Sequence, residues 1–430
     1  MSEMRERIHG EIKRTIILVA VLLLLGSVVM LYCEWRGNLP DSLYACRKMF
    51  LAMPVFAVPI GMAHYHAGRG LSSREYITQI FCGNRISGKR NVYMDYARII
   101  AAGLVILNHA CSMQADANVE LWKTTLLKIC MGVSLFSNPL YVMISGALLL
   151  SGEKEETPGA FYFRRFVKVV LPMVIYYIIF LCVSGQISLI PPENLGDGAL
   201  QILAGASGIV PHYWLIYVLI SLYITAPFMR AMVKNLNDSY ITVLFFLILI
   251  EEGLTVWLPL TGVRLGITMN LASWEGVFIL GYILTKRRTK WMERFVLIFG
   301  GISAIAIPSV IVWNDSLTDY ISNTAPVMVL FAGAVLTVLS KLENNLKGKF
   351  SFPVQTLSKY SYSIILVHWY GLFVVTWGKI GIQPLRFGCV GGIVLTVLAA
   401  FTVCYILGFT AENTVVRAVQ YIVTGFGHFS

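Results

Sequence analysis

Charged residues are scarce in this 430-residue chain, since Lys, Arg, Asp and Glu together make up only 13% of it. A soluble protein usually carries about 25% charged residues. Hydrophobic residues make up 57% of the chain, and its mean hydropathy is +0.70. Such a chain cannot cover its own surface against water, so much of that surface is expected to face lipid. The composition therefore predicts an integral membrane protein and excludes an ordinary soluble domain.

The sequence also lacks the short motifs of nucleotide and metal chemistry. It contains no P-loop, GxSxG, HExxH or dinucleotide-binding glycine pattern, so nucleotide hydrolysis and zinc chemistry have no support. Its eight cysteines show no CxxC or zinc-type spacing, and we expect them to be small buried hydrophobic residues. We therefore expect no metal site and no permanently bound cofactor.

Twelve hydrophobic stretches approach the length that crosses a bilayer, which is about 20 mostly apolar residues. One of them, 270–286, is short and contains Glu275. In chain order they are 14–33, 48–65, 93–114, 127–150, 168–187, 212–232, 239–257, 270–286, 295–313, 325–341, 359–378 and 388–411. The sequence thus predicts an all-α polytopic membrane protein with the lipid bilayer as its partner.

The basic residues fall mainly in short connections between these stretches. With the N-terminus in the cytoplasm, 26 Lys and Arg residues lie on the inner side and 8 on the outer side. This distribution follows the positive-inside rule. It predicts cytoplasmic N- and C-termini in a bacterial cell (inner) membrane. It also explains the net charge of +11 without nucleic acid as a partner.

The hydrophobic stretches suggest four segments. Residues 1–66 form a two-helix membrane unit, and 67–92 form a basic cytoplasmic linker. Residues 93–411 form a ten-helix membrane body, and 412–430 form a short cytoplasmic tail. No internal repeat is present, which weakens an interpretation as an inverted-repeat transporter.

The first helix of the body carries polar residues that are costly inside a membrane and are therefore functional candidates. In YMDYARIIAAGLVILNHA, Asp95 and Arg98 lie at the predicted cytoplasmic end, and Asn108 and His109 lie deeper. Arg98 and His109 are about 16 Å apart along the helix axis. A buried imidazole is expected to be neutral and able to act as a general base. The alternatives are a core histidine and an arginine that anchors the helix at the membrane surface.

A second basic set lies where the next-but-one helix leaves the cytoplasm, in FYFRRFVKVVLP. Arg165 and Lys168 are three residues apart on one helix face, next to Arg164. With Arg98 they would form a phosphate-binding patch at the inner surface. The alternative is that they are ordinary positive-inside residues.

Other polar residues in the hydrophobic stretches are weaker candidates. His368 lies inside the eleventh stretch, and Ser145 and the glycine after it suit close helix packing as well as a supporting role. His212, Trp214 and Glu275 lie near the predicted outer face, where they are candidates for contacting an acceptor. Aromatic residues are expected there in any case.

Five stretches occur in an order that resembles the membrane-bound acyltransferase family 3, and they span about 93–407. They are DYARIIAAGLVILNH, PLYVMISGALLL, FRRFVKVVLP, HYWLIYVLISLYITAP and LSKYSYSIILVHWYG. The second and fourth look most like the branch that O-acetylates surface polysaccharides. The two N-terminal helices lie outside the resemblance.

The resemblance implies a body of about ten helices, an acyl-CoA co-substrate such as acetyl-CoA, and an extracytoplasmic carbohydrate acceptor. It implies that His109 and Arg98 correspond to the essential histidine and arginine of the family. It also implies that Arg165 and Lys168 correspond to the family's RxxR pair. Lysine in the second position keeps the charge but lacks the planar fork that binds phosphate through two hydrogen bonds.

Three other functions fit a protein of this kind. The first is an exporter of a polysaccharide or lipid-linked sugar that transfers no acyl group. The second is a non-catalytic membrane sensor. The third is an amino-acid-modifying system similar to the membrane part of vancomycin-resistance serine racemases, although this chain carries no soluble racemase domain.

Overall fold

The computed structural model describes most of the predicted body and part of the segment before it. The expected helix 14–33 and most of 48–65 lie outside the described residues. The described residues are 59–83, 91–115, 119–152, 156–189, 192–205, 208–263, 266, 273–347 and 351–425.

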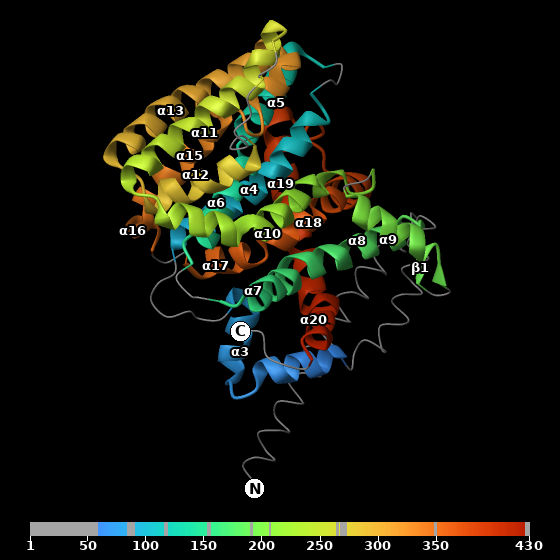
Figure 1. Ribbon diagram of the computed structural model, residues 1–430. Coiled ribbons are helices and arrows are strands. Elements are labelled where there is room, and N and C mark those ends of the chain that lie inside the picture. The colour runs from blue at the N-terminus through green and yellow to red at the C-terminus, as the bar shows by residue number, and fades with distance from the viewer. Residues whose placement is uncertain are drawn as a thin grey trace.

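Almost all of the described residues are helical, as the sequence predicts (Figure 1). The exception is a short antiparallel ribbon of two strands, β1 (Ser188–Leu189) and β2 (Pro192–Glu193). A helix at 59–68 comes first. The other helices are α3 (Ser73–Cys82), α4 (Val92–Ser112), α5 (Leu121–Ser134), α6 (Ser137–Leu149), α7 (Pro158–Arg165), η1 (Phe166–Val170), α8 (Leu171–Val183), α9 (Leu195–Ala204), η2 (Pro211–Tyr213), α10 (Trp214–Asn235), α11 (Asp238–Trp257), η3 (Leu258–Thr261), α12 (Trp274–Lys286), α13 (Lys290–Trp313), η4 (Asp315–Leu317), α14 (Thr318–Ile321), α15 (Pro326–Lys341), α16 (Glu343–Leu346), α17 (Ser351–Lys359), α18 (Ser361–Trp369), η5 (Tyr370–Ile380), α19 (Cys389–Ala411), η6 (Glu412–Val416) and α20 (Arg417–Val423).

Seven helices of the described part are long and apolar enough to cross a membrane, and an eighth is added if α14 and α15 form one bent span. The chain is therefore a multi-pass membrane protein. All ten stretches predicted for the body are helical, but α4 and α12 are not among these spans. At 1.5 Å per residue, the 21 residues of α4 extend about 31 Å, close to the thickness of the hydrocarbon core. The 13 residues of α12 reach only about 20 Å.

The ends of the predicted body differ from the structure in two places. The expected linker 67–92 contains the regular helix α3, which begins with a capping box between Ser72 and Glu75. At the other end, α19, η6 and α20 follow one another without a break, so the helix passes the expected end at 411 and reaches Val423.

Two glycines allow α6 and α12 to pack at very short range. A Cβ atom at Gly146 would lie 1.8 Å from the carbonyl oxygen of Phe278, and one at Gly281 would lie 2.0 Å from that of Met143. Each helix therefore offers a glycine where the other's backbone approaches. Small residues serve this purpose in membrane bundles, where close packing replaces the hydrophobic effect. The packing role predicted for the glycine after Ser145 is confirmed.

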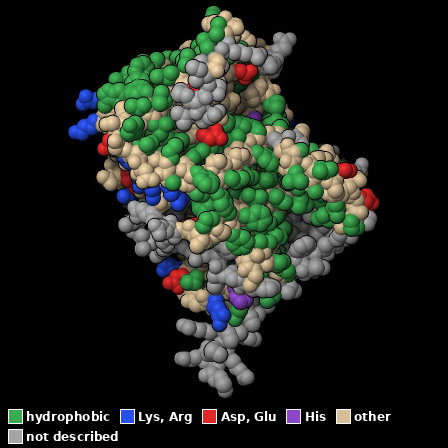
Figure 2. All heavy atoms as spheres, viewed as in Figure 1, with side chains coloured by type: hydrophobic (Ala, Val, Ile, Leu, Met, Phe, Trp, Pro, Cys, Tyr) green, Lys and Arg blue, Asp and Glu red, His purple; other side chains and the backbone are tan. Residues whose placement is uncertain are grey.

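Ion pairs join helix ends that are far apart in the sequence. Arg287 at the end of α12 pairs with Asp238 at the start of α11, with 2.7 Å between Nη2 and Oδ1. Lys341 pairs with Glu293 at 2.5 Å. These four residues lie on the side that the charge distribution predicts to be cytoplasmic. Figure 2 shows hydrophobic side chains over most of the visible face, as a lipid-facing surface requires.

Within the described residues, three π-helical segments interrupt the long helices, and such segments are frequent at functional sites. The first, η1, ends just before Pro172, whose missing N–H leaves the carbonyl four residues earlier without its usual donor. Side chains from other helices bind the carbonyls of η1, since Gln420 Nε2 donates to Val167 O at 3.0 Å and the Tyr362 hydroxyl to Val169 O at 2.9 Å. Of the other two, η5 directly follows Trp369, and η6 directly precedes Arg417.

Candidate active site

Helix α4 carries both ends of the candidate site. Its first free N–H groups are bound by the carboxylate of Glu343, which accepts from Val92 N at 3.1 Å and from Tyr93 N at 2.7 Å. Negative charge at a helix N-terminus is stabilising. Eleven residues at 3.6 per turn place Arg98 and His109 within about 20° of one another around the axis, so they share a helix face.

His109 meets two other histidines from distant parts of the chain. The centroids of the His109 and His368 rings are 5.2 Å apart in a stacked arrangement, and those of His212 and His368 are 4.6 Å apart. His109 comes from α4, His212 from η2 and His368 from α18. We call these three residues the histidine cluster. His368 lies between the other two.

The hydrogen bonds of two cluster members fix which ring nitrogen carries the proton. His212 Nε2 donates to Leu366 O at 3.0 Å, and His368 Nδ1 donates to Ile365 O at 2.6 Å. A carbonyl can only accept, so in the neutral form the other nitrogen of each ring carries a lone pair. These nitrogens, His212 Nδ1 and His368 Nε2, are buried without a hydrogen-bond partner in the described part of the chain. Two basic nitrogens are thus available at the cluster.

Trp369 closes one side of the histidine cluster. Its ring is stacked on that of His212 at 6.1 Å and meets that of His109 edge-on at 5.3 Å. Among the described residues, no group of three or more His, Cys, Asp or Glu side chains is arranged to hold a metal ion. The unpartnered nitrogens of the cluster suit it to moving protons, with the apolar Trp369 ring beside it.

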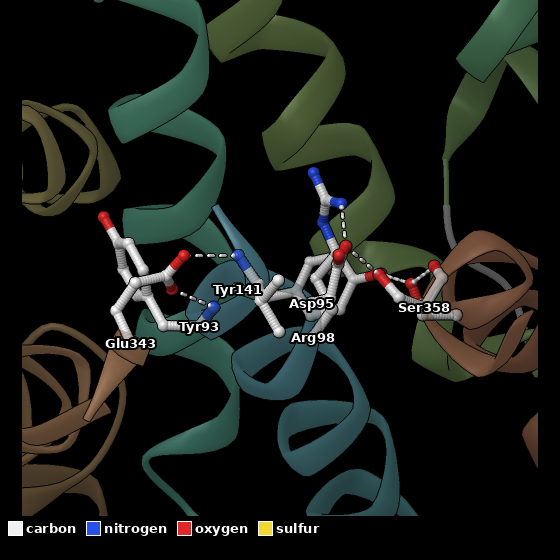
Figure 3. Close-up of polar contacts among 8 residues, drawn as sticks. Tyr93, Asp95, Arg98, Tyr141, Glu343 and Ser358 are labelled. Carbon is white, nitrogen blue, oxygen red and sulfur yellow. Dashed lines mark hydrogen bonds and ion pairs between the residues drawn. The ribbon is translucent and has the colours of Figure 1, made fainter. Parts of the chain in front are cut away.

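The other end of α4 presents Arg98, held by a short chain of polar contacts (Figure 3). Arg98 Nη1 lies 3.5 Å from Asp95 Oδ1, which also accepts a hydrogen bond of 2.7 Å from Ser358. The Asp95 side chain is only 3% exposed, whereas that of Arg98 is 30% exposed. Buried Asp95 therefore positions a guanidinium group that a ligand can reach.

Arg165 lies near this end as well, and Arg164 beside it is engaged in an ion pair. Arg165 and Arg230 both lie over the ring of Phe161, at 5.3 Å and 5.6 Å from its centroid, and Arg165 Nε is buried without a partner in the described structure. Arg164 is paired with Glu156 at 2.5 Å. An arginine already paired with a carboxylate is a weaker ligand for phosphate.

Lys168, which lies in η1, borders a cavity together with Arg417, Gln420 and residues from before the body. It is also within electrostatic reach of Arg165 and Arg164. Arg165 and Arg98 share the surroundings of Tyr223 and Tyr141, which lie within electrostatic reach of one another. Lys168 therefore lies between the neighbourhood of Arg165 and the cavity.

Asn108 and Ser145 have supporting positions. Asn108 Nδ2 donates to Met131 O at 3.3 Å and to Ser134 Oγ at 3.1 Å, which joins α4 to α5 next to His109. Ser145 accepts a hydrogen bond from the Tyr223 hydroxyl at 3.3 Å and donates to Tyr141 O at 3.0 Å. Both residues hold helices in place beside the candidate site.

Trp214 and Glu275, both predicted for the acceptor side, lie near the start of α12. Trp214 itself is the first residue of α10. The ring of Trp214 packs against that of Trp274, with centroids 5.5 Å apart, and Glu275 follows Trp274. Buried Glu252 accepts a hydrogen bond from the backbone N–H of Ser273, next to the start of α12. His212, predicted for the same group, belongs to the histidine cluster instead.

The chain matches the acyltransferase domain of the acyltransferase 3 family over residues 91–409, about three quarters of its length. It belongs to that family. Comparison with curated proteins and with solved structures found no match. The membership makes this protein a membrane acyltransferase. The acyltransferase domain contains every member of the histidine cluster, Arg98 and Arg165. The helix 59–68, α3, η6 and α20 lie outside it.

Proposed function

We propose that this acyltransferase moves an acetyl or other short acyl group from cytoplasmic acyl-CoA to a hydroxyl group of an extracytoplasmic polysaccharide or glycan. The observation that carries the proposal is the histidine cluster, whose member His109 shares a helix face with a reachable arginine, while His212 and His368 each bring an unpartnered ring nitrogen to it. A thioester with an anionic head is a long substrate, and α4 offers a site for each of its ends.

The chemistry needs one base and one acid. His109 takes the proton of the acceptor hydroxyl, and the resulting oxygen nucleophile attacks the thioester carbonyl. The carbon–sulfur bond breaks and an oxygen ester forms. The imidazolium then returns its proton to the departing CoA thiolate, so the enzyme is unchanged. His368, stacked on His109, supports the imidazolium form as a second proton acceptor.

Arg98 and Arg165 would bind phosphate groups of the donor at the other end. Arg98 is oriented by Asp95 and remains reachable, and Arg165 has a buried Nε without a partner in the described structure. Charge-assisted hydrogen bonds from guanidinium to phosphate are among the strong ones in proteins. These contacts would hold the donor with its thioester directed along α4 toward His109.

Purified protein incubated with labelled acetyl-CoA and a set of candidate glycans tests the proposal. The wild type should form labelled glycan. The His109→Ala variant should lose activity by at least the 10²–10⁴-fold typical of a general base. Ser112→Ala is a matched control one turn further along α4, because its hydroxyl contacts only the His109 carbonyl, and it should keep full activity. Transport of glycan without labelling would instead favour an exporter.

A further inference from the structure

A second cavity lies at the junction between the acyltransferase domain and the segments on either side of it. Its volume is about 200 Å³. His66 from the helix 59–68 and Gln79 from α3 form one wall, Lys168 from η1 a second, and Arg417 and Gln420 a third. Only Lys168 among these five belongs to the matched domain, 91–409. The flanking segments therefore supply most of this cavity.

The cavity is positively charged. Lys168 and Arg417 both line it, and none of the described residues around it is Asp or Glu. Neither cation has a carboxylate within ion-pair distance among the residues that the structure describes. Glu412 is near Arg417, but its Oε1 accepts a hydrogen bond from Ser363 at 2.6 Å. Two cations without a carboxylate at ion-pair distance favour an anionic ligand.

Hydrogen bonds hold the walls of the cavity in place. Lys359 Nζ donates to the carbonyl oxygens of Gln79, at 3.1 Å, and Ile80, at the C-terminal end of α3. The Tyr360 hydroxyl donates to the same Ile80 oxygen at 2.6 Å. The Ile80 carbonyl is one that a helix end leaves without its backbone donor. These hydrogen bonds attach α3 firmly to the acyltransferase domain.

A relay of polar groups lies beside Arg417. The charge of Arg417 reaches the hydroxyl of Tyr76, which donates to His64 Nδ1 at 2.5 Å. His64 Nε2 in turn donates to Asn413 O at 2.7 Å. The relay thus joins the helix 59–68 and α3 to η6, which directly precedes Arg417.

The size of the cavity limits what it binds. Pockets for drug-sized ligands measure about 300–1,000 Å³, so a cavity of about 200 Å³ suits part of a ligand and excludes a whole acyl-CoA. A phosphate group with the first atoms attached to it fits both the size and the charge. The exposed side chain of Lys168 makes the cavity reachable.

We infer that this cavity is a phosphate-binding subsite built by Arg417 and Lys168, in which the segments outside the acyltransferase domain complete the recognition of a phosphate-bearing ligand. Two kinds of ligand carry such a phosphate group. One is the nucleotide end of the donor, in which case the inference rests on the proposed function. The other is the headgroup of an anionic phospholipid.

Binding measurements on the full chain distinguish these sources. In nanodiscs of phosphatidylcholine, adenosine 3′,5′-bisphosphate is titrated by calorimetry as the probe for the donor. In a second arm, phosphatidylglycerol is titrated and its binding is followed by native mass spectrometry. Arg417→Gln should weaken one of them by about tenfold or more, as expected for the loss of a hydrogen bond to a charged group. Lys168→Gln, in a different element, should weaken the same probe.

Arg74→Gln is the matched control, because Arg74 lies exposed on α3 outside the cavity, and it should leave both affinities unchanged. Weaker binding of the bisphosphate by the cavity variants identifies the donor as the ligand. Weaker binding of phosphatidylglycerol identifies the lipid as the ligand. Wild-type affinity of both probes for both cavity variants would overturn the inference. His109→Ala should bind the bisphosphate normally, so failure of acyl transfer is recognised separately from failure of this subsite.

Discussion

Replacing Gly146 by alanine should destabilise the protein through a single methyl group. The new Cβ atom would lie 1.8 Å from the carbonyl oxygen of Phe278, which belongs to the backbone of α12. Carbon–oxygen contacts between helices are usually about 3.3–3.6 Å. The two helices would therefore have to separate by about 1.5 Å, and no side-chain rotation can relieve the overlap.

The expected magnitude is the balance of two opposing terms. Overpacking of a close contact costs about 1–3 kcal/mol and sometimes more. Alanine in place of glycine within a helix raises the free energy of unfolding by about 1 kcal/mol, because alanine has the higher helix propensity. Because the contact at Gly146 is with backbone, the cost should be at or above the upper part of its range. We expect a net loss of about 2 kcal/mol.

Thermal unfolding in one detergent, followed by intrinsic fluorescence, measures the effect. Gly301→Ala on α13 is the matched control, because a Cβ atom there meets nothing within 4 Å. Its melting temperature should equal that of the wild type or exceed it, whereas that of Gly146→Ala should be clearly lower. Equal melting temperatures for the two variants would refute the close packing of α6 against α12.

Three further perturbations have defined outcomes. Ser358→Ala removes a hydrogen bond that orients Asp95 beneath Arg98, so the KM for the donor should rise several-fold in steady-state kinetics with little change in kcat. His368→Ala should lower kcat at least tenfold while calorimetry shows unchanged donor binding; an equal loss of binding would contradict its place at the reacting end. Burial lowers the pKa of Lys359 from its usual 10.5 to about 7. The unfolded chain therefore binds more protons between these values, and stability should rise with pH across that window. Melting curves of Lys359→Met should lack this rise.

Hydropathy predicted the helices of the body well, because each of them must place apolar side chains against lipid. For α12, the predicted stretch 270–286 is helical from Trp274 onward, and its first residues lie outside the described ones. Hydropathy gives no signal for a helix that belongs to no span. The helix α3 within the expected linker was missed. Ser72, followed three residues later by Glu75, is the capping-box pattern that predicts a helix start.

The candidate site could be predicted only in part. His109 and Arg98 share one helix, so their spacing is readable from the sequence. The approach of His212 and His368 to His109 depends on how η2, α4 and α18 pack, which no local pattern encodes. Trp369, Ser358 and Arg230 were missed for the same reason. The chain offers no signal that Lys168 also lines a cavity with Arg417, because that cavity depends on how η1, α3 and α20 pack.

The most direct test of the account is acyl transfer across a sealed membrane. The protein is reconstituted into liposomes in one orientation, with labelled acetyl-CoA supplied on one side only and acceptor glycan on the other. The account predicts labelled glycan when the donor is on the Arg98 side, none when the two are exchanged, and none with His109→Ala. Labelling that is independent of the donor's side, or that persists in His109→Ala, would contradict it.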